Sequence, residues 1–319
     1  MSAHDALSRL QHAVESRILG QDRLVRRLLI GLLADGHLLV EGFPGLAKTR
    51  AIKTLGAALD ARFSRIQFTP DLLPADITGS DMFYQQAGGG EFRFDPGPVF
   101  ANLVLADEIN RAPAKVQAAL LEAMEERQVT VAGQTHPLPE VFLVMATQNP
   151  IEHEGTYPLP EAQLDRFLMH IRVGYPAPGD EMAMLRLLRA GNGDAPVAPA
   201  ASAADILAAR RGVSAVHASE SLDRYIVDLV QATRQPAALG GDIARWLEVG
   251  ASPRGSVALD RCARAHAWLA GRDFATPDDV RAIAHDALRH RLVLGYEASA
   301  EGIAADRVID LLIERVRPV

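Results

Sequence analysis

The sequence is poor in cysteine, in positive charge and in long apolar runs, and each shortage excludes a class of protein. Its single cysteine, Cys262, excludes an intrachain disulfide and any metal site built from several cysteines. Cys262 falls in a helical pattern, where we expect a buried side chain and not a reactive thiol. Lys and Arg number 33 against 40 Asp and Glu, giving a net charge of −7. This balance argues against a large nucleic-acid interface, and against a DNA translocase.

No stretch of the sequence is apolar for long enough to cross a bilayer, and residues 1–18 lack the apolar core of a signal peptide. We therefore expect a cytoplasmic protein without a membrane span. The ten histidines occur without the paired spacing of a zinc site. No internal repeat is visible on inspection.

The 319 residues are 48% hydrophobic and 23% charged, as in a globular protein long enough for two domains. A break rich in proline and glycine at 174–180 separates a half with strand and helix patterns from a half with helical patterns only. We expect an α/β domain over residues 1–175 and a helical domain over residues 176–319. The expected helices are 3–16, 22–33, 47–59, 114–127, 181–189, 204–210, 221–233, 256–270, 277–288 and 305–315, and the expected strands are 38–41, 64–68, 103–108 and 141–146.

Two hairpins are expected within the first domain. Residues 82–84 and 91–94 have strand-like composition around a run of glycines, and residues 128–139 contain a second strand pair around Gly133. The insertions therefore span about 80–96 and 128–139. The alternative for the first of them is a loop without a role.

The segment from His37 to Arg50, HLLVEGFPGLAKTR, has the pattern of a phosphate-binding loop between a strand and a helix. Glycines let the backbone turn several N–H groups inward, and the helix N-terminus adds partial positive charge. Lys48 would then reach the β- and γ-phosphates, and the Thr49 hydroxyl would bind Mg²⁺. Ala47 stands where glycine is usual, and is small enough to keep the approach open. The alternative is a turn that binds nothing. The expected nucleotide-contacting residues are Gly42, Pro44, Gly45, Leu46, Ala47, Lys48, Thr49 and Arg50.

An apolar strand at 103–106 ends in two adjacent carboxylates, Asp107 and Glu108. Downstream of a phosphate-binding loop, the first is suited to hold Mg²⁺ and the second to act as general base on the attacking water. In isolation the same pair is an ordinary acidic turn.

Three further polar residues occupy suggestive places. Asn149 follows the strand at 141–146, where an amide can orient a water, although asparagine before proline is also a turn signal. Arg166 could complete the site of a neighbouring subunit as an arginine finger, or lie solvated at a helix end. Arg254 lies at a helix N-terminus, where a cation opposes the helix dipole, which suggests a compensating anion or simple exposure.

Together these residues resemble the AAA+ ATPases, and in particular the MoxR family, over nearly the whole chain. The motifs that carry the resemblance are GFPGLAKT at 42–49, LADEINRAP at 105–113, ATQNP at 146–150, EAQLDRF at 161–167 and SPRGS at 252–256.

The resemblance implies a role for each matching residue. Lys48 and Thr49 would form the Walker A pair, and Asp107 and Glu108 the Walker B pair. The remaining roles are sensor 1 for Asn149, an arginine finger acting in trans for Arg166, sensor 2 for Arg254 and adenine packing for residues 18–21, including Gln21.

The same resemblance implies a five-stranded parallel sheet flanked by helices, followed by an all-helical lid. It implies an ATPase that uses ATP and Mg²⁺, usually in a hexameric ring, with both hairpins facing the pore. Members of the family act as chaperone-like enzymes that mature or remodel protein targets, often with von Willebrand factor A domain partners. A competing hypothesis is a binding scaffold that ATP locks together, with turnover incidental.

Overall fold

In the computed structural model, residues 2–86, 89–150, 155–189 and 197–318 are described. Five parallel strands form the central sheet in the order β2-β5-β8-β1-β9, as the family resemblance implied. Their bounds are Leu38–Glu41 for β1, Phe63–Gln67 for β2, Leu103–Asp107 for β5, Leu143–Gln148 for β8 and Met169–Arg172 for β9. The sequence pattern indicated four of these strands, and β9 is the one it missed.

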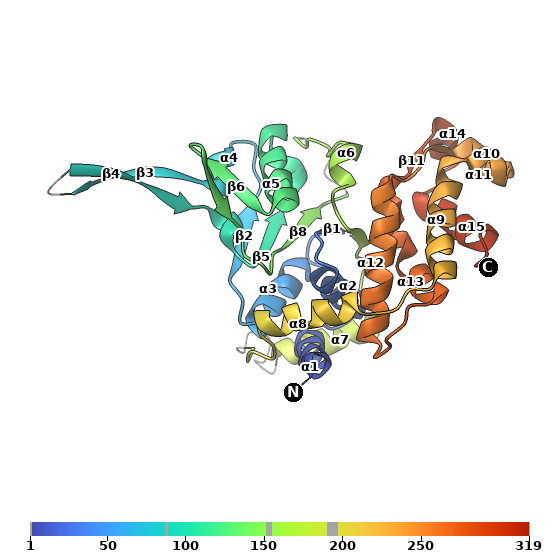
Figure 1. Cartoon of the computed structure of the whole chain (residues 1–319), viewed down its shortest axis with the longest axis horizontal. Coiled ribbons are helices and arrows are strands. Elements are labelled where there is room, and N and C mark those ends of the chain that lie inside the picture. The colour runs from blue at the N-terminus through green and yellow to red at the C-terminus, as the bar shows by residue number, and fades with distance from the viewer. Residues whose placement is uncertain (1, 87–88, 151–154, 190–196, 319) are drawn as a thin grey trace.

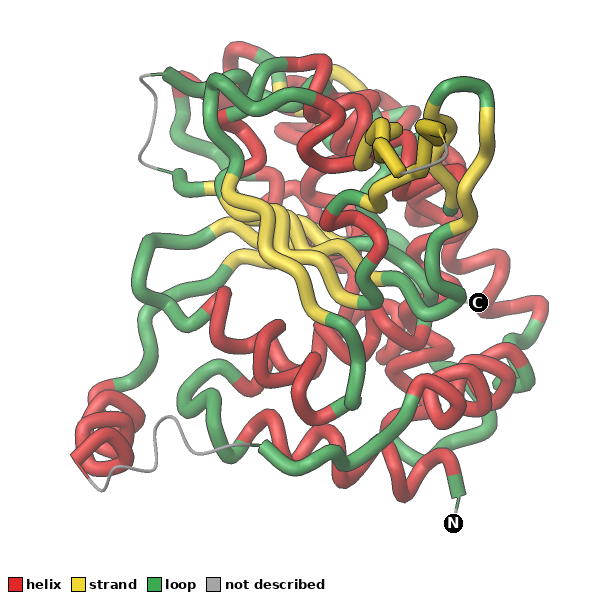
Figure 2. Tube along the Cα trace, turned by 90° about the vertical axis from the view of Figure 1, so that its left-hand side faces the viewer, coloured by secondary structure: helices red, strands yellow, loops and turns green. Residues whose placement is uncertain are grey.

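The central strands are apolar on both faces because helices cover both faces (Figure 2). Leu103 and Leu105 of β5 join the core beneath α1, α2 and α3, whereas Val104 and Ala106 join the core beneath α4 and α5. These helices span Ala3–Glu15 for α1, Asp22–Leu33 for α2, Lys48–Ala58 for α3, Pro74–Thr78 for α4 and Ala114–Glu126 for α5. The carboxyl ends of all five strands consequently open at one edge of the sheet.

Two antiparallel hairpins extend from this domain, as expected. Strands β3 (Gly79–Gln86) and β4 (Gly89–Pro96) form a long arm that projects away from the body (Figure 1). Gly88 in its expected turn lies outside the described residues. Strands β6 (Gln128–Val131) and β7 (Gln134–Pro137) form the second hairpin. The ring of Phe94 stacks on His136 at 3.8 Å, so the hairpins contact each other.

The C-terminal part of the chain is a helical lid region, most of which lies at the right of Figure 1, whereas its first two helices lie below the sheet domain in that view. It also contains one short antiparallel strand pair, β10 with β11, which the expectation of an all-helical lid did not include. These strands have three and two residues, too few to show an alternating pattern. The helices are α7 (Pro178–Arg189), α8 (Ala203–Ser214), α9 (Glu220–Arg234), α10 (Pro236–Leu239), α11 (Gly241–Trp246), α12 (Pro253–Leu269), α13 (Pro277–Leu288), α14 (Tyr296–Ala300) and α15 (Ala305–Arg315), and the strands are β10 (Leu247–Val249) and β11 (Val293–Leu294). Short 3₁₀ turns occupy Pro98–Phe100, Ile109–Arg111 and Arg289–Arg291.

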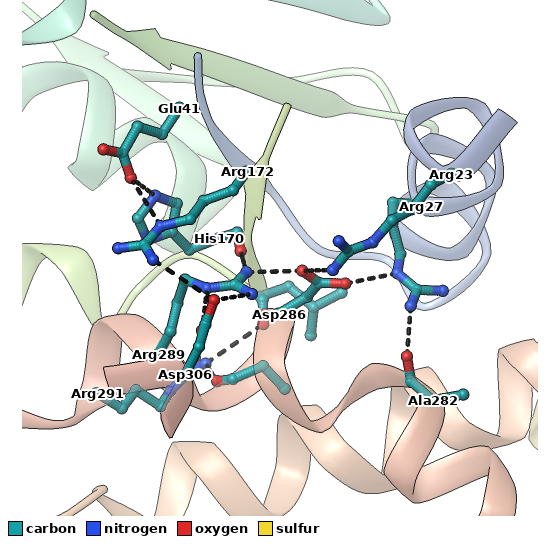
Figure 3. A network of polar contacts seen from close by, with 12 residues as sticks. Arg23, Arg27, Glu41, His170, Arg172, Ala282, Asp286, Arg289, Arg291 and Asp306 are labelled. Atoms are coloured by element: carbon teal, nitrogen blue, oxygen red, sulfur yellow. Dashed lines mark hydrogen bonds and ion pairs between the residues drawn. The ribbon is translucent and has the colours of Figure 1, made fainter. Parts of the chain in front are cut away.

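The lid is attached to the sheet domain by a network of ion pairs (Figure 3). Asp286 of α13 is 0% exposed, and its carboxylate lies 2.7 Å from each of three guanidiniums, those of Arg23 and Arg27 on α2 and of Arg289. Burial raises the pKa of Asp286, but the three guanidiniums outweigh it and lower that pKa overall. Arg289 also binds Asp306 of α15 at 2.8 Å. The lid and α2 are thus joined around a buried charge.

The network continues to the strand that precedes the phosphate-binding loop. Arg172 of β9 lies 3.4 Å from Asp306 and 3.3 Å from Glu41, the last residue of β1. The imidazole of His170 and the guanidinium of Arg172 lower the pKa of Glu41 to about 2, although burial opposes them. Charged contacts therefore run from the lid to the residue before Gly42 (Figure 3).

Two further expectations concern membrane spans and the single cysteine. Within the described ranges, no helix combines the length and apolarity needed to cross a membrane. Cys262 is 0% exposed on α12, and burial raises the pKa of its thiol to about 12. The expected burial of Cys262 is confirmed, and its low reactivity stays a prediction.

Candidate nucleotide-binding site

The loop between β1 and α3 has the backbone geometry that phosphate binding requires. Gly45 has φ +83°, and Ala47, which caps the N-terminus of α3, has φ +58°. Glycine is usual at position 47 because the left-handed conformation costs other residues about 1–2 kcal/mol. Ala47 therefore has a strained backbone conformation, in addition to being small enough to leave room for a phosphate. The side-chain amine of Lys48 donates to the carbonyl of Gly42 across the loop.

The two adjacent acids lie at the carboxyl end of β5 and are held by a buried threonine. The Thr147 hydroxyl donates to Asp107 Oδ1 at 2.6 Å and accepts from the backbone N–H of Glu108 at 3.0 Å. Glu108 itself has φ +58°, in the left-handed region. Such backbone conformations gather at functional sites, where the surrounding contacts enforce them. Thr147 thus fixes the carboxylate of Asp107 and the backbone of Glu108 relative to β8.

Each acid also has a partner from a neighbouring element. Arg65 of β2 lies 2.7 Å from Asp107 Oδ2. Glu108 Oε2 accepts from the Gln67 amide at 2.9 Å and from Arg111 Nη1 at 2.9 Å. The catalytic candidate is therefore held through one of its two carboxylate oxygens.

A cleft of about 330 Å³ brings the loop and the acids together at the carboxyl edge of the sheet. Twelve residues line it, from the loop and the start of α3, from the end of β5 and from the end of β8. These residues are Pro44, Gly45, Leu46, Ala47, Lys48, Thr49, Arg50, Asp107, Glu108, Thr147, Gln148 and Asn149. The carboxyl edge of a parallel sheet is the usual ligand position in α/β folds.

Two predicted nucleotide contacts lie beside this cleft and do not line it. Gly42 packs against β9, where an added Cβ would lie 2.8 Å from the carbonyl oxygen of Val173, and its N–H donates to Gln148 O at 3.3 Å. Gln21 is buried, and its side-chain amide donates to Gly174 O at 3.0 Å. Gly42 therefore shapes the loop, and Gln21 joins residues 18–21 to the segment after β9.

Arg166 and Arg254 do not reach the cleft of their own chain. Both lie on Glu125 near the end of α5, with Arg166 Nη1 at 2.9 Å and Arg254 Nη2 in direct contact. They line a second cavity of about 340 Å³. In this single chain Arg254 lies outside the cleft because α12 packs on α2, with its N-terminus near the end of α5. The reach of Arg254 from the lid to the γ-phosphate stays a prediction.

Comparison with known proteins identifies the fold's relatives. Residues 37–169 match the model for the ATPase family associated with various cellular activities, and residues 242–312 match the AAA lid domain. The chaperone MoxR1 of Mycobacterium tuberculosis is 49% identical over 311 residues, covering 97% of this chain and 81% of that protein. The MoxR protein of Paracoccus denitrificans is 37% identical, covering 91% and 90%. This chain belongs to the MoxR family of AAA ATPases.

A solved structure supports the same assignment for the whole chain. A candidate ATPase from Cytophaga hutchinsonii superposes with a TM-score of 0.92 at 45% identity, covering 99% of this MoxR-family chain and 96% of that one. The uncharacterized protein YeaC of Bacillus subtilis is 44% identical, covering 98% and 95%.

Several residues of the MoxR-family site were missed by sequence reasoning. Arg65 and Gln67 reach the acids from β2 because β2 pairs with β5 in parallel, with Gln67 opposite Asp107. A polar residue at the carboxyl end of a predicted strand was the available signal for Gln67. Thr147 lies inside the ATQNP motif, but no role was predicted for it from the sequence. No sequence pattern distinguishes Glu125 from the other acidic residues of α5, so its contact with the two arginines could not be predicted.

Proposed function

We propose that this AAA ATPase hydrolyses ATP to ADP and phosphate in the cleft between the phosphate-binding loop and β5. The observation that carries the proposal is the convergence of Lys48, Thr49, Asp107, Glu108 and Asn149 on one cleft. The loop N–H groups and the N-terminus of α3 favour the phosphates, and Lys48 adds a positive charge. AAA family membership supports ATP as the nucleotide.

The residues of the cleft fit a magnesium ion. Mg²⁺ prefers oxygen ligands, and the Thr49 hydroxyl and the Asp107 carboxylate line the same cleft. Asp107 would exchange its contact with Arg65 for the ion. When bound, Mg²⁺ would neutralise charge on the phosphates.

Glu108 is proposed as the general base. It would accept a proton from water as the water oxygen bonds to the γ-phosphorus and the bond to the bridging oxygen of ADP breaks. Gln67 and Arg111 both donate to Oε2 of its side chain and so orient the carboxylate from one side. Asn149, at the end of β8, would orient the attacking water or detect the γ-phosphate.

We propose that Arg166 acts on the ATP of an adjacent copy in a ring, usually a hexamer in this family. Its position away from the cleft of its own chain supports a role in trans. A guanidinium supplied by a neighbour stabilises the charge of the transition state. In this scheme the ATPase is completed only by assembly.

The work of hydrolysis is proposed to be chaperone-like remodelling of protein targets, because the similar MoxR1 protein is named a chaperone. The projecting hairpin supports contact with protein, since it exposes large apolar side chains. These are Met82, Phe83, Tyr84 and Phe92. A partner with a von Willebrand factor A domain and a cytoplasmic location belong to the same proposal.

The substitution Glu108→Gln tests the chemistry. Hydrolysis should fall by about 10²–10⁴-fold, the usual contribution of a general base, while ATP binding persists. Lys48→Ala is the comparison variant, and should lose ATP binding as well. Unchanged turnover in Glu108→Gln with ATP bound would show that the assigned base is wrong.

The remodelling role has its own experiment. The Glu108→Gln protein, loaded with ATP, should retain its target in a pulldown that fails with ADP. Full maturation of that captured target by Glu108→Gln would instead favour a binding scaffold in which turnover is incidental.

A further inference from the structure

A single carboxylate, that of Glu125, holds two arginines that come from distant parts of the chain. Glu125 lies in the last turn of α5, Arg166 follows α6 (Glu161–Leu164), and Arg254 lies in the first turn of α12 of the lid. Oε2 lies 2.9 Å from Arg166 Nη1, and Oε1 contacts Arg254 Nη2. Each carboxylate oxygen thus engages one guanidinium.

The backbones that carry these two arginines are joined to each other beneath Glu125. Ser252, the N-cap of α12, donates its hydroxyl to Asp165 Oδ2 at 2.7 Å and accepts from the N–H of Arg254 at 3.1 Å. Asp165, the residue before Arg166, is bound by the buried Arg291 at 2.8 Å. The backbone at Arg166 and Arg254 is therefore held in place. The side chains of these two arginines are 35% and 45% exposed, so their guanidiniums lie at the surface.

The cavity around Glu125 carries an excess of positive charge. Five arginines and three carboxylates line its 340 Å³. The arginines are Arg127, Arg166, Arg254, Arg261 and Arg291, and the acids are Asp35, Glu125 and Asp165. An anion entering from solvent would compensate this excess. A phosphate suits the place, because two guanidiniums can each take one of its oxygens, as they take those of Glu125.

We propose that Glu125 is a regulatory placeholder, which holds Arg166 and Arg254 in the unassembled chain and yields both to the terminal phosphate of ATP bound by an adjacent copy. This inference rests on the proposed ATPase function. Exchange is feasible because both ion pairs are partly exposed and hence weak, while a terminal phosphate carries more charge and one more oxygen than a carboxylate. ATP hydrolysis is thereby kept slow until the chain assembles with an adjacent copy that has ATP bound.

Substitution of Glu125 by glutamine tests the placeholder, since it removes the charge and keeps the shape. At saturating ATP, hydrolysis per chain should rise about fivefold, the factor that corresponds to the loss of one or two exposed ion pairs. Glu125→Ala should give the same rise. In an Arg166→Ala background the substitution should give no rise, because the gain acts through that arginine. A purely structural effect of Glu125 would be independent of Arg166.

Glu122→Gln is the matched control, one turn earlier on α5 and exposed, and should leave hydrolysis unchanged. A fall or no change in Glu125→Gln, with normal wild-type hydrolysis, would overturn the placeholder and leave the ATPase assignment intact. A rise that persists in the Arg166→Ala background would also overturn it. Absence of hydrolysis in the wild-type protein would instead refute the proposed function.

Discussion

The buried charge cluster at Asp286 provides a quantitative test of how the lid is attached. Asp286→Asn removes the negative charge and keeps the side-chain shape. It leaves Arg27 and Arg289, whose side chains are 7% and 3% exposed, without their shared counter-ion. Breaking a buried ion pair by removing one partner costs about 3–5 kcal/mol. Arg23 should contribute little to this loss, because its side chain is 55% exposed and can turn to water.

The expected loss converts to a measurable temperature shift. With an unfolding entropy of about 2.1 cal/mol/K per residue, a chain of 319 residues loses about 4–7 °C in Tm. Calorimetry and urea unfolding provide the measurement. Asp278→Asn is the matched control on the same helix, because Asp278 is 86% exposed and pairs only with Arg281 in the described part of the chain. That control should cost less than about 1 kcal/mol.

The pH dependence has a defined sign. The folded-state pKa of Asp286 is lowered, so its stabilisation is fully present above the unfolded-state pKa of about 3.9 and is lost as the pH falls through the folded value. The difference in stability between wild type and Asp286→Asn should therefore shrink in acid. Equal losses for Asp286→Asn and Asp278→Asn at neutral pH would refute the reasoning.

Three other predictions concern single side chains. Thr147→Val should destabilise the protein by about 1–3 kcal/mol and reduce ATP hydrolysis, because the N–H of Glu108 and the carboxylate of Asp107 lose their shared hydroxyl. Thr147→Ser should restore both stability and hydrolysis. A valine variant with the stability and hydrolysis of the wild type would contradict this prediction. Ala47→Gly should raise the free energy of unfolding by up to about 1 kcal/mol, since glycine adopts φ +58° with less strain, and a loss in thermal unfolding would be the contrary result. The Cys262 thiol should react with an aromatic disulfide at pH 8 only after unfolding, because it is fully buried with a pKa near 12, so fast labelling of the native protein would show that α12 opens.

The parts of the site that are contiguous in sequence were predictable. The residues from Gly45 to Thr49 form one loop, and Asp107 and Glu108 follow one apolar strand, so a short window contains each half of the cleft. Helices with a strong apolar period, such as α2 and α13, were predicted to the residue. Their buried faces repeat every three to four residues, which the sequence displays directly.

The missed features depend on partners that are distant in sequence. Strand β9 has four residues, with only Met169 and Ile171 buried, and is recognised by its pairing with β1. The pairing of β2 with β5 brings Gln67 to Glu108, across 41 residues. Neither of these strand pairings can be recognised from a local sequence pattern.

The sequence alone determined the nucleotide-binding motifs of this AAA ATPase, because a phosphate-binding loop and an acid pair at a strand end are short motifs with the needed residue types. Only the tertiary structure decided which residues act together. Arg166 and Arg254 are 88 positions apart in the chain, yet they share Glu125 because α12 docks on α2 beside the end of α5. Packing between helices depends on side chains from segments that are distant in sequence, so no single segment predicts it. The position of the two arginines outside the cleft of their own chain follows from this packing.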